Sequence, residues 1–318
     1  GITNPLDISQ YPVLTRKQLQ ENRYNIFSNG YKSKYLNFQL RRHTSSGTSG
    51  IPINVYWDQH DYMQSVLSLW RKRFEWYGVI AQDRYITFTL PYMIKEDISE
   101  SILYQENGNE LFVNAASLTS AEKYKTLIEK IACFKPKWLY IQPFILEQLI
   151  YWYKEYDIKP PSSLIYIESV GEILTKELKK ISMSFFGVPI ANLYGSQEHN
   201  GIAYECPYGN MHILEDNVYV EKNAIITNLN NYAYPLIRYD QGDIINLSSS
   251  VISCRCGVHT QCIDSIYGRL SQSFKISDFE VSAYLLSEVI SYVNNKYNGM
   301  IVFYNYISCQ YLLKNNPL

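Results

Sequence analysis

The sequence lacks the features that mark membrane-spanning, secreted and nucleic-acid-binding proteins. No apolar run approaches the roughly 18 residues that a membrane helix needs. The opening GITNPLDISQ holds neither the basic nor the apolar segment of a signal peptide. The 29 basic and 30 acidic residues nearly cancel, which argues against general attraction to nucleic acid or to an anionic membrane. We therefore expect a cytoplasmic protein without nucleic-acid or membrane partners.

Repeats, low-complexity tracts and a disulfide framework are also missing. The chain has six cysteines among 318 residues and no secretory signal, so reduced thiols are the default. Its hydrophobic fraction of 46% and charged fraction of 19% are typical of a globular protein. A chain of this length buries roughly three quarters of its unfolded surface and forms one large domain or two moderate ones.

Short apolar runs alternate with helical patterns through much of the chain. Asp58 is placed to cap a long amphipathic helix that Gly78 would end, and Thr119 with Glu122 indicates a capping box. The other predicted elements are strands over 54–57, 84–90, 138–141, 164–170 and 189–193, and helices over 15–22, 119–133, 144–153 and 175–185. Repeated strand–helix–strand units imply an α/β fold with a largely parallel sheet.

The pattern changes in the last third of the chain. Residues 205–267 are predicted to be β-rich and barrel-like, with short strands separated by Asn, Gly and Pro. Residues 275–318 return to a mixed pattern, which favours a boundary near 268–273. The elements predicted in this part are strands over 217–221, 224–228 and 300–306 and a helix over 282–295.

One loop packs hydroxyls and glycines into consecutive positions: Thr44, Ser45, Ser46, Gly47, Thr48, Ser49 and Gly50. Glycine lets backbone N–H groups turn toward an anion and the hydroxyls add donors, so such a loop can cradle a phosphate. It is not a Walker loop, because it lacks the Gly-x-x-x-x-Gly-Lys pattern. Taken alone, the loop also fits a flexible linker, although the extended segment after it argues against one.

Two further motifs follow apolar runs. LYGSQEHNG places Tyr194, Gly195 and Glu198 at the carboxyl end of a strand, where α/β sheets bind ligands. The Glu198 carboxylate could hold Mg²⁺ with a nucleotide phosphate. PLIRYDQGD puts Asp243 directly after a Gly turn, where its carboxylate could accept hydrogen bonds from a ribose diol. Each motif also fits an ordinary surface turn when read alone.

A group of cysteines and one histidine suggests a local metal site. Cys206 and His212 lie in ECPYGNMH, and Cys254 and Cys256 form a short thiol pair in CRCG. Cysteine and histidine in tetrahedral geometry are the usual zinc ligands, so these four predict a structural Cys3His site that pins two β-hairpins together. His259 and Cys262 are spare candidates, and buried reduced cysteines without a metal are the alternative.

The order and spacing of these motifs resemble the adenylate-forming acyl-CoA ligases, and within them the branch of phenylacetate–CoA ligases and capsule-biosynthesis homologues. The similar segments are TSSGTSGIP, ESVGEIL, NLYGSQE, ECPYGNMHILEDN, PLIRYDQGD, and CRCG before IYGR. The resemblance implies a large α/β N-terminal domain over 1–268, with layered parallel sheets and a β-rich, zinc-bearing portion over 205–267. Part of a small α+β C-terminal lid is expected over 269–318.

The resemblance also implies roles for individual residues. Ser46, Thr48 and Glu198 would be catalytic, with Glu198 binding Mg²⁺. Tyr194 would stack on adenine opposite the Gly171–Glu172 turn, and Asp243 would bind the ribose. The full set expected to bind the nucleotide is Thr44, Ser45, Gly47, Ser49, Gly50, Gly171, Glu172, Asn192, Tyr194, Gly195, Asp243 and Arg269. The residues expected to line the acid pocket are Tyr85, Phe88, Tyr140, Pro143 and Phe144.

The implied reaction has two half-reactions. A small carboxylic acid attacks the α-phosphate of ATP and expels pyrophosphate, and a thiol of CoA or a carrier protein then takes the acyl group and expels AMP. Positioning and charge neutralisation dominate such chemistry. ATP/AMP, Mg²⁺, structural Zn²⁺ and CoA are the expected cofactors, and a homodimer is expected. The alternatives are a homologue that binds a nucleotide or metabolite without turnover, a partner-dependent subunit, or adenylyl transfer to a hydroxyl.

The chain departs from the family pattern at three places. Ile51 stands where the phosphate loop usually has Lys, and Gln197 stands where the Tyr-Gly-x-Thr-Glu pattern has Thr. Fewer residues follow Arg269 than the family's lid contains, and no lysine among them stands in a recognisable catalytic motif. We therefore expect a partial lid and reduced ligase efficiency.

Overall fold

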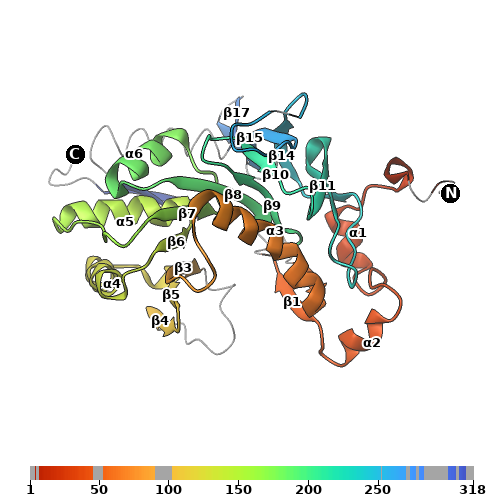
Figure 1. Cartoon of the computed structure of the whole chain (residues 1–318), viewed down its shortest axis with the longest axis horizontal. Coiled ribbons are helices and arrows are strands. Elements are labelled where there is room, and N and C mark those ends of the chain that lie inside the picture. The colour runs from red at the N-terminus through yellow and green to blue at the C-terminus, as the bar shows by residue number, and fades with distance from the viewer. Residues whose placement is uncertain are drawn as a thin grey trace. The chain divides into compact units, whose positions relative to one another are not determined.

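A computed structural model describes residues 4, 7–45, 53–89, 102–251, 253–269, 273–276, 279–282, 300–305 and 308–312. The chain divides into two compact units (Figure 1). Unit 1 comprises residues 1–81 and 191–272, and unit 2 comprises residues 82–190 and 273–318. Within the described ranges, the structure contains no helix whose length and hydropathy would let it cross a bilayer.

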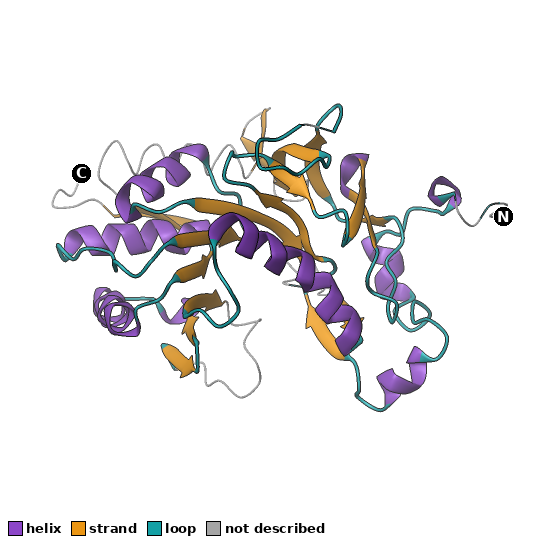
Figure 2. Cartoon of the chain, viewed as in Figure 1, coloured by secondary structure: helices purple, strands orange, loops and turns teal. Residues whose placement is uncertain are grey.

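Unit 2 is built from parallel strands and helices. Its first strands are β3 (Tyr85–Thr89), β4 (Tyr104–Asn107), β5 (Glu110–Asn114), β6 (Trp138–Ile141) and β7 (Tyr166–Val170). Its helices are η3 (Ala115–Ser117), α4 (Ala121–Phe134), α5 (Pro143–Glu155) and α6 (Lys176–Phe186). The strand order is β7-β6-β3-β5-β4, in which only β4 pairs antiparallel with its neighbour. Helix α5 lies between α4 and α6 (Figure 2).

The core of unit 2 forms because successive strand residues point to opposite faces. Ile86 and Phe88 on β3 are buried in one apolar cluster with Leu139 and Ile141 on β6. Tyr85 and Tyr140 occupy the alternate positions of the same strands and are only half-buried. The helices α4, α5 and α6 supply most of the other apolar side chains of this cluster, and strands β5 and β7 supply several more.

Two hairpins account for the rest of the described part of unit 2. Strand β16 (Ser273–Ile276) pairs antiparallel with β17 (Phe279–Ser282), and β18 (Met300–Asn305) with β19 (Ser308–Leu312). The strand predicted over 300–306 is therefore confirmed. Most of the helix predicted over 282–295 lies outside the described residues, and Ser282 ends a strand.

Unit 1 is dominated by antiparallel strands. Its helices are η1 (Ile8–Gln10), α1 (Arg16–Glu21), α2 (Tyr31–Leu36), α3 (Gln59–Tyr77) and η4 (Lys222–Ala224). Its strands are β1 (Arg41–Thr44), β2 (Asn54–Trp57), β8 (Ile190–Ser196), β9 (Asn200–Glu205), β10 (Met211–Ile213), β11 (Val218–Glu221), β12 (Ile225–Asn228), β13 (Tyr239–Asp240), β14 (Asp243–Leu247) and β15 (Cys262–Arg269). They pair as β1-β2, β14-β15-β10-β9-β8 and β11-β12-β13. The predicted α/β fold with a β-rich portion is confirmed.

Local capping signals explain where the helices begin and end. Helix α3 starts after Asp58, whose carboxylate accepts a hydrogen bond from the His60 N–H, and it ends at Gly78, whose φ of 67° is left-handed. The capping box predicted at Thr119 is wrong by one residue. Ser120 has the extended backbone of an N-cap, and its hydroxyl accepts a hydrogen bond from Lys123 N. Glu122 is therefore the second residue of the helix, and a capping box needs it at the third.

Candidate functional site

The end of strand β8 meets the start of strand β14 through two side-chain contacts. The Tyr194 hydroxyl donates a hydrogen bond of 2.7 Å to Asp243 Oδ2, and the Ser196 hydroxyl lies 3.4 Å from Gln241 Oε1. Gly242, with a φ of 75°, makes the turn between Gln241 and Asp243. The two separate motifs predicted to bind adenine and ribose are thus joined in one place.

The backbone at this place is unusually close-packed. The register of the β8–β9 pairing shifts between Tyr194 and Gly195, and a Cβ added to Gly195 would lie 2.4 Å from the Asn200 carbonyl oxygen. Only glycine therefore fits this strand position without displacing strand β9. Strand β8 runs through the Tyr-Gly pair to Ser196, past the end predicted at residue 193, because it continues pairing with β9.

Arg16 links the start of the Ser/Thr/Gly loop to the Glu198 carboxylate. Its Nη2 donates a hydrogen bond of 3.1 Å to Ser45 Oγ, and its Nη1 lies 3.8 Å from Glu198 Oε1. The Glu198 side chain is 1% exposed, and such a buried carboxylate requires a compensating charge. Sequence reasoning missed Arg16, because its partners are far away along the chain and it belongs to no motif.

The two ends of the loop are held together by hydrogen bonds. Ser45 N donates to the Ile53 carbonyl, Ile53 N donates to Ser45 Oγ, and both distances are 2.9 Å. One step further out, the Thr44 hydroxyl donates a bond of 2.8 Å to Asn54 Oδ1. The predicted residues Ser46, Gly47, Thr48, Ser49 and Gly50 lie outside the described residues.

One buried and one half-buried histidine belong to the same region of unit 1. His199, directly after Glu198, is completely buried, and burial lowers its pKa to about 3. Burial, together with the charge of Arg41, lowers the pKa of His43 to about 4. Both imidazoles are therefore neutral near pH 7. Neither was predicted, since a lone histidine in a sequence carries no signal of its burial.

The other predicted nucleotide residues have differing placements. Asn192 lies on β8, where its backbone N–H donates a hydrogen bond of 2.9 Å to Glu205 Oε2. Arg269 is the register partner of Asp243 across β14 and β15, which brings these two expected nucleotide-binding positions side by side at the backbone. The order of the motifs along the sequence did not reveal this pairing.

Unit 2 carries the Gly171–Glu172 turn and the predicted acid pocket. Gly171 has a φ of 81°, and the Glu172 carboxylate accepts a hydrogen bond of 3.2 Å from the Phe144 N–H at the start of α5. This bond places the turn beside Pro143 and Phe144. A Cβ at Gly171 would lie 3.7 Å from the Gln142 side chain.

The strand positions divide the remaining acid-pocket residues between two faces. Tyr85 stacks on Trp138 with ring centroids 4.8 Å apart, and the register of β3 and β6 puts Tyr140 on that same face. Phe88 is 1% exposed and packs in the core on the opposite face. We correct the predicted pocket accordingly, because strand alternation prevents Phe88 from lining the surface that the two tyrosines share.

The predicted cysteine and histidine ligands converge. Cys206 and His212 flank the β9–β10 turn, and Cys254 and Cys256 lie between β14 and β15. The possible ligand atoms of these four residues all lie within 4.8 Å of one another. Cys206 Sγ and Cys254 Sγ are 3.7 Å apart, too far for a disulfide bond of ~2.05 Å. We call these four residues the Cys3His cluster.

Two similar turns present the cysteines of this cluster. Gly209 N donates to the Cys206 carbonyl at 2.9 Å, and Gly257 N donates to the Cys254 carbonyl at 3.0 Å. Both glycines have a left-handed φ, 82° and 83°. His212 Nε2 lies 3.3 Å from Cys256 Sγ, while its Nδ1 lies 3.0 Å from the Thr260 hydroxyl. A second hydrogen-bond partner of this kind orients a ligating histidine.

Aromatic side chains cover one side of the Cys3His cluster. Trp76 of α3 stacks on Tyr204 with ring centroids 5.7 Å apart and lies 5.8 Å from the His212 ring. Cys262 Sγ lies 3.5 Å from His212 Nδ1, the nitrogen that faces away from Cys256. Cys262 is therefore a neighbour of the cluster and not one of its four members, and the spare candidate His259 is not one of the four either.

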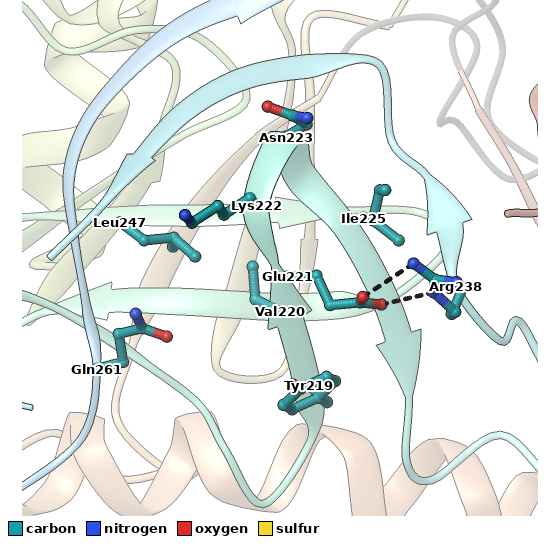
Figure 3. A pocket seen from close by; sticks show the side chains of 9 residues that line it. All are labelled: Tyr219, Val220, Glu221, Lys222, Asn223, Ile225, Arg238, Leu247 and Gln261. Atoms are coloured by element: carbon teal, nitrogen blue, oxygen red, sulfur yellow. Dashed lines mark hydrogen bonds and ion pairs between the residues drawn. The ribbon is translucent and has the colours of Figure 1, made fainter. Parts of the chain in front are cut away.

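A shallow pocket of about 450 Å³ opens elsewhere on unit 1, around strands β11 and β12 (Figure 3). Arg238 at its edge forms a bidentate ion pair with Glu221, at 3.0 and 3.1 Å. The same guanidinium donates to the carbonyls of Ser9 and Tyr11. Its charge thus holds the N-terminal arm and the β11–β13 sheet together.

Comparisons with known proteins rest on structure, because no family model and no curated protein sequence matches the chain. 2-Hydroxyisobutyryl-CoA ligase in the postadenylation state, in complex with R3-HIB-AMP, is similar over 89% of this chain, with a TM-score of 0.67 and 15% identity. The chain has the fold of the adenylate-forming CoA ligases. It spans 63% of the length of that ligase.

Two further structures agree with this fold. The same ligase in an open conformation, with 2-HIB-AMP and CoA, matches 96% of this chain and 74% of its own at a TM-score of 0.62 and 16% identity. The anthranilate CoA ligase AuaEII in complex with anthranoyl-AMP matches 80% of this chain and 51% of its own, with a TM-score of 0.50 and 16% identity. At these identities the likeness establishes the fold.

Proposed function

We propose that the chain activates a carboxylic acid with ATP. The carboxylate oxygen attacks the α-phosphorus, the bond from that phosphorus to the pyrophosphate oxygen breaks, and an acyl-adenylate forms. The sulfur of a thiol, CoA or a carrier protein, then attacks the acyl carbon and releases AMP. The observation that carries this proposal is the contact between Tyr194 and Asp243 in a chain with the CoA-ligase fold.

The residues of unit 1 divide the work of holding the nucleotide. Tyr194 offers an aromatic face to adenine, and its hydroxyl fixes the Asp243 carboxylate as an acceptor for the ribose hydroxyls. Gly195 keeps strands β8 and β9 close enough for this arrangement. Ser45 starts the loop proposed to receive the phosphates. Positioning of the reactants is the main contribution that such a site makes to the rate.

Mg²⁺ fits the Glu198 position in its donor chemistry. A carboxylate oxygen is the ligand that Mg²⁺ prefers, and the ion would neutralise phosphate charge during pyrophosphate release. Glu198 Oε1 is buried and lies 3.8 Å from the Arg16 guanidinium, beyond hydrogen-bonding distance. Mg²⁺ would then take the place of this guanidinium beside the carboxylate.

We propose that the Cys3His cluster holds a structural zinc ion. With Zn–S bonds of about 2.3 Å, tetrahedral geometry separates two sulfur ligands by about 3.8 Å. The observed distance between Cys206 Sγ and Cys254 Sγ is 3.7 Å. Four protein ligands leave no open position, so the ion would stabilise the two hairpins. A reducing, cytoplasmic compartment suits such thiolate ligands.

An aromatic acid is the proposed substrate class, as in the phenylacetate–CoA ligase branch. The face of β3 and β6 that carries Tyr85, Trp138 and Tyr140 is aromatic, and stacked rings on it suit an aryl group. Phe144 and the Gly171–Glu172 turn lie together at the adjacent end of α5. This surface supports an aryl acid over a short aliphatic one.

The test of the proposed function is ATP–pyrophosphate exchange with a panel of aryl and short-chain carboxylic acids. We expect exchange that depends on an aryl acid and Mg²⁺, followed by thioester formation when CoA is added. Exchange without thioester would favour a carrier-protein thiol or adenylyl transfer to a hydroxyl. Absence of exchange with every acid would contradict the proposal.

A second candidate function is nucleotide binding without turnover. The observation that favours it is the absence of Lys and Arg from residues 43–70, the segment that contains the proposed phosphate loop. Gln197 also removes the hydroxyl that the family motif carries at this place. ATP affinity without exchange would select this candidate.

Sedimentation of the purified chain would test the expected homodimer.

A further inference from the structure

We propose that Arg16 is the cation that binds the terminal phosphates of the nucleotide. The inference rests on the proposed function and names a residue that the motifs do not contain. It starts from a charge imbalance. ATP brings several negative charges to a loop whose own segment, residues 43–70, has no lysine or arginine. A cation from outside this segment would complement Mg²⁺ there.

The structure places Arg16 at the base of that loop. The Arg16 Nη2 to Ser45 Oγ distance is 3.1 Å, and Ser45 is the last described residue before the segment 46–52. The Ser45–Ile53 hydrogen bonds close the loop at this point. The guanidinium thus lies where the chain enters and leaves the loop, although Arg16 and Ser45 are 29 positions apart in the sequence.

The backbone under Arg16 is fixed by its own helix. Thr15 caps α1, its hydroxyl accepts from Gln18 N, and the Gln18 side chain accepts from Thr15 N in a complete capping box. Arg16 is the first residue of this helix, so its backbone is anchored while its side chain extends to Ser45 and Glu198. The side chain remains 21% exposed, which leaves it accessible to a ligand.

Ser45 supplies a second donor to the same point. Its hydroxyl oxygen accepts hydrogen bonds from Arg16 Nη2 and from Ile53 N, which occupy its two acceptor positions. Within the described residues, the Ser45 hydroxyl makes these two hydrogen bonds and accepts in both. Its own proton is therefore available to be donated to a ligand. Ser45 is 5% exposed, so this is a buried polar group beside a guanidinium. Two donors of this kind suit a phosphate oxygen.

Glu198 keeps the Arg16 side chain in place before the nucleotide arrives. The Arg16 Nη1 to Glu198 Oε1 distance of 3.8 Å is too long for a hydrogen bond, so phosphate oxygens can approach this nitrogen more closely, provided that Mg²⁺ then compensates the Glu198 charge. Glu198 would then hold Mg²⁺. Guanidinium is well matched to phosphate because its donors form a planar fork. Arg16 therefore compensates for Ile51, which cannot contribute a charge.

The test compares ligands that contain or lack the terminal phosphates. Isothermal titration measures binding of Mg-ATP, pyrophosphate and AMP to the wild-type chain and to Arg16→Gln, Arg16→Lys and Lys17→Gln. We expect Arg16→Gln to weaken ATP and pyrophosphate about 10- to 100-fold and AMP less than about twofold, as for loss of a charged hydrogen bond. Arg16→Lys should recover part of the loss. Lys17, with an exposed side chain, is the matched control and should change nothing.

The outcomes separate this inference from the function on which it rests. An equal loss of ATP and AMP affinity in Arg16→Gln, or no loss, overturns the role of Arg16 alone. Absence of ATP, AMP and pyrophosphate binding by the wild-type chain overturns both proposals. If Arg16→Gln does not fold, Arg16→Lys decides the question. That variant must still show a lower ratio of ATP to AMP affinity, and an unchanged ratio contradicts the role.

Discussion

The Tyr194 hydroxyl donates a hydrogen bond of 2.7 Å to the Asp243 carboxylate, which joins two motifs that lie 49 residues apart in the chain. Tyr194 is 9% exposed, so the bond is largely shielded from water. A shielded bond to a charged acceptor is worth about 1.5–3 kcal/mol. It therefore fixes the position of one oxygen of the Asp243 carboxylate.

The first prediction concerns this pair. Asp243→Asn should weaken AMP and ATP equally, by about tenfold or more, because both ligands carry the ribose. Tyr194→Phe keeps the ring but releases the carboxylate, so we expect a smaller, similarly equal loss of about 3- to 10-fold. Titration with AMP and ATP checks both values. Tyr219→Phe, at an exposed position of β11, should bind like the wild-type chain. Unchanged AMP affinity in Asp243→Asn would contradict the ribose role.

The second prediction concerns the backbone next to Tyr194. Gly195→Ala should destabilise the chain by about 1–3 kcal/mol, since the new Cβ would meet the Asn200 carbonyl and force β8 and β9 apart. Urea unfolding measures the change. The control is Gly108→Asn, at an open position with a φ of 61° that asparagine tolerates, and it should shift stability by less than about 1 kcal/mol. Equal stability of the Gly195→Ala variant would show that β9 yields without cost.

The third prediction concerns the Cys3His cluster. Elemental analysis of the purified chain should find one zinc ion, and a strong chelator should remove it with a clear fall in the melting temperature. Trp76 lies 5.8 Å from the His212 ring, so its fluorescence should change at the same chelator concentration.

A pair of cysteine variants provides the control for that experiment. Cys256→Ala should lose zinc, whereas Cys262→Ala should keep it, although both sulfurs lie within 3.5 Å of the His212 ring nitrogens. The two variants remove the same atoms from neighbouring positions and differ only in membership of the cluster. Zinc absent from the wild-type chain, or retained in Cys256→Ala, would contradict the proposed zinc site at the Cys3His cluster.

Local signals predicted much of this fold because they act within a few residues. Asp58 and Gly78 fix both ends of α3 through their own backbone and side chain, so the helix follows from the sequence. Helix α2 follows Gly30, which provides no side-chain cap, so the sequence carries no such signal for it. The short strand β4 is mostly exposed, so it lacks the apolar alternation that reveals a strand.

The site divides in the same way. Cysteines, glycines and Asp243 could be selected from their motifs, because their chemistry demands neighbours at fixed spacing. Arg16 and His199 could not, since only tertiary contacts and burial distinguish them. Arg16 meets Glu198 across 182 positions, and no pattern in either segment announces the contact. Phe88 was misplaced because motif order does not say which face of a strand a residue occupies.

The last prediction concerns acid stability and the buried His199. Its pKa in the folded chain is about 3, below the ordinary value of 6.5, so the unfolded chain binds more protons between these values. The stability from burying the neutral ring is fully present above pH 6.5 and is lost as the pH falls toward 3. At pH 5 the loss attributable to His199 is about 2 kcal/mol, since each pH unit corresponds to about 1.4 kcal/mol.

Urea unfolding at pH 7 and pH 5 measures this loss. His199→Phe fills the same space against Tyr239 with a ring that cannot bind a proton, so the difference between the two pH values should shrink by about 2 kcal/mol. His60→Gln is the matched control, because the His60 side chain is 75% exposed. It should retain the wild-type difference. His43, with a pKa of about 4, contributes a second loss in the same direction, so His199→Phe should reduce the acid sensitivity and not abolish it. An unchanged pH difference in His199→Phe would mean that the ring is protonated or hydrated in the folded chain.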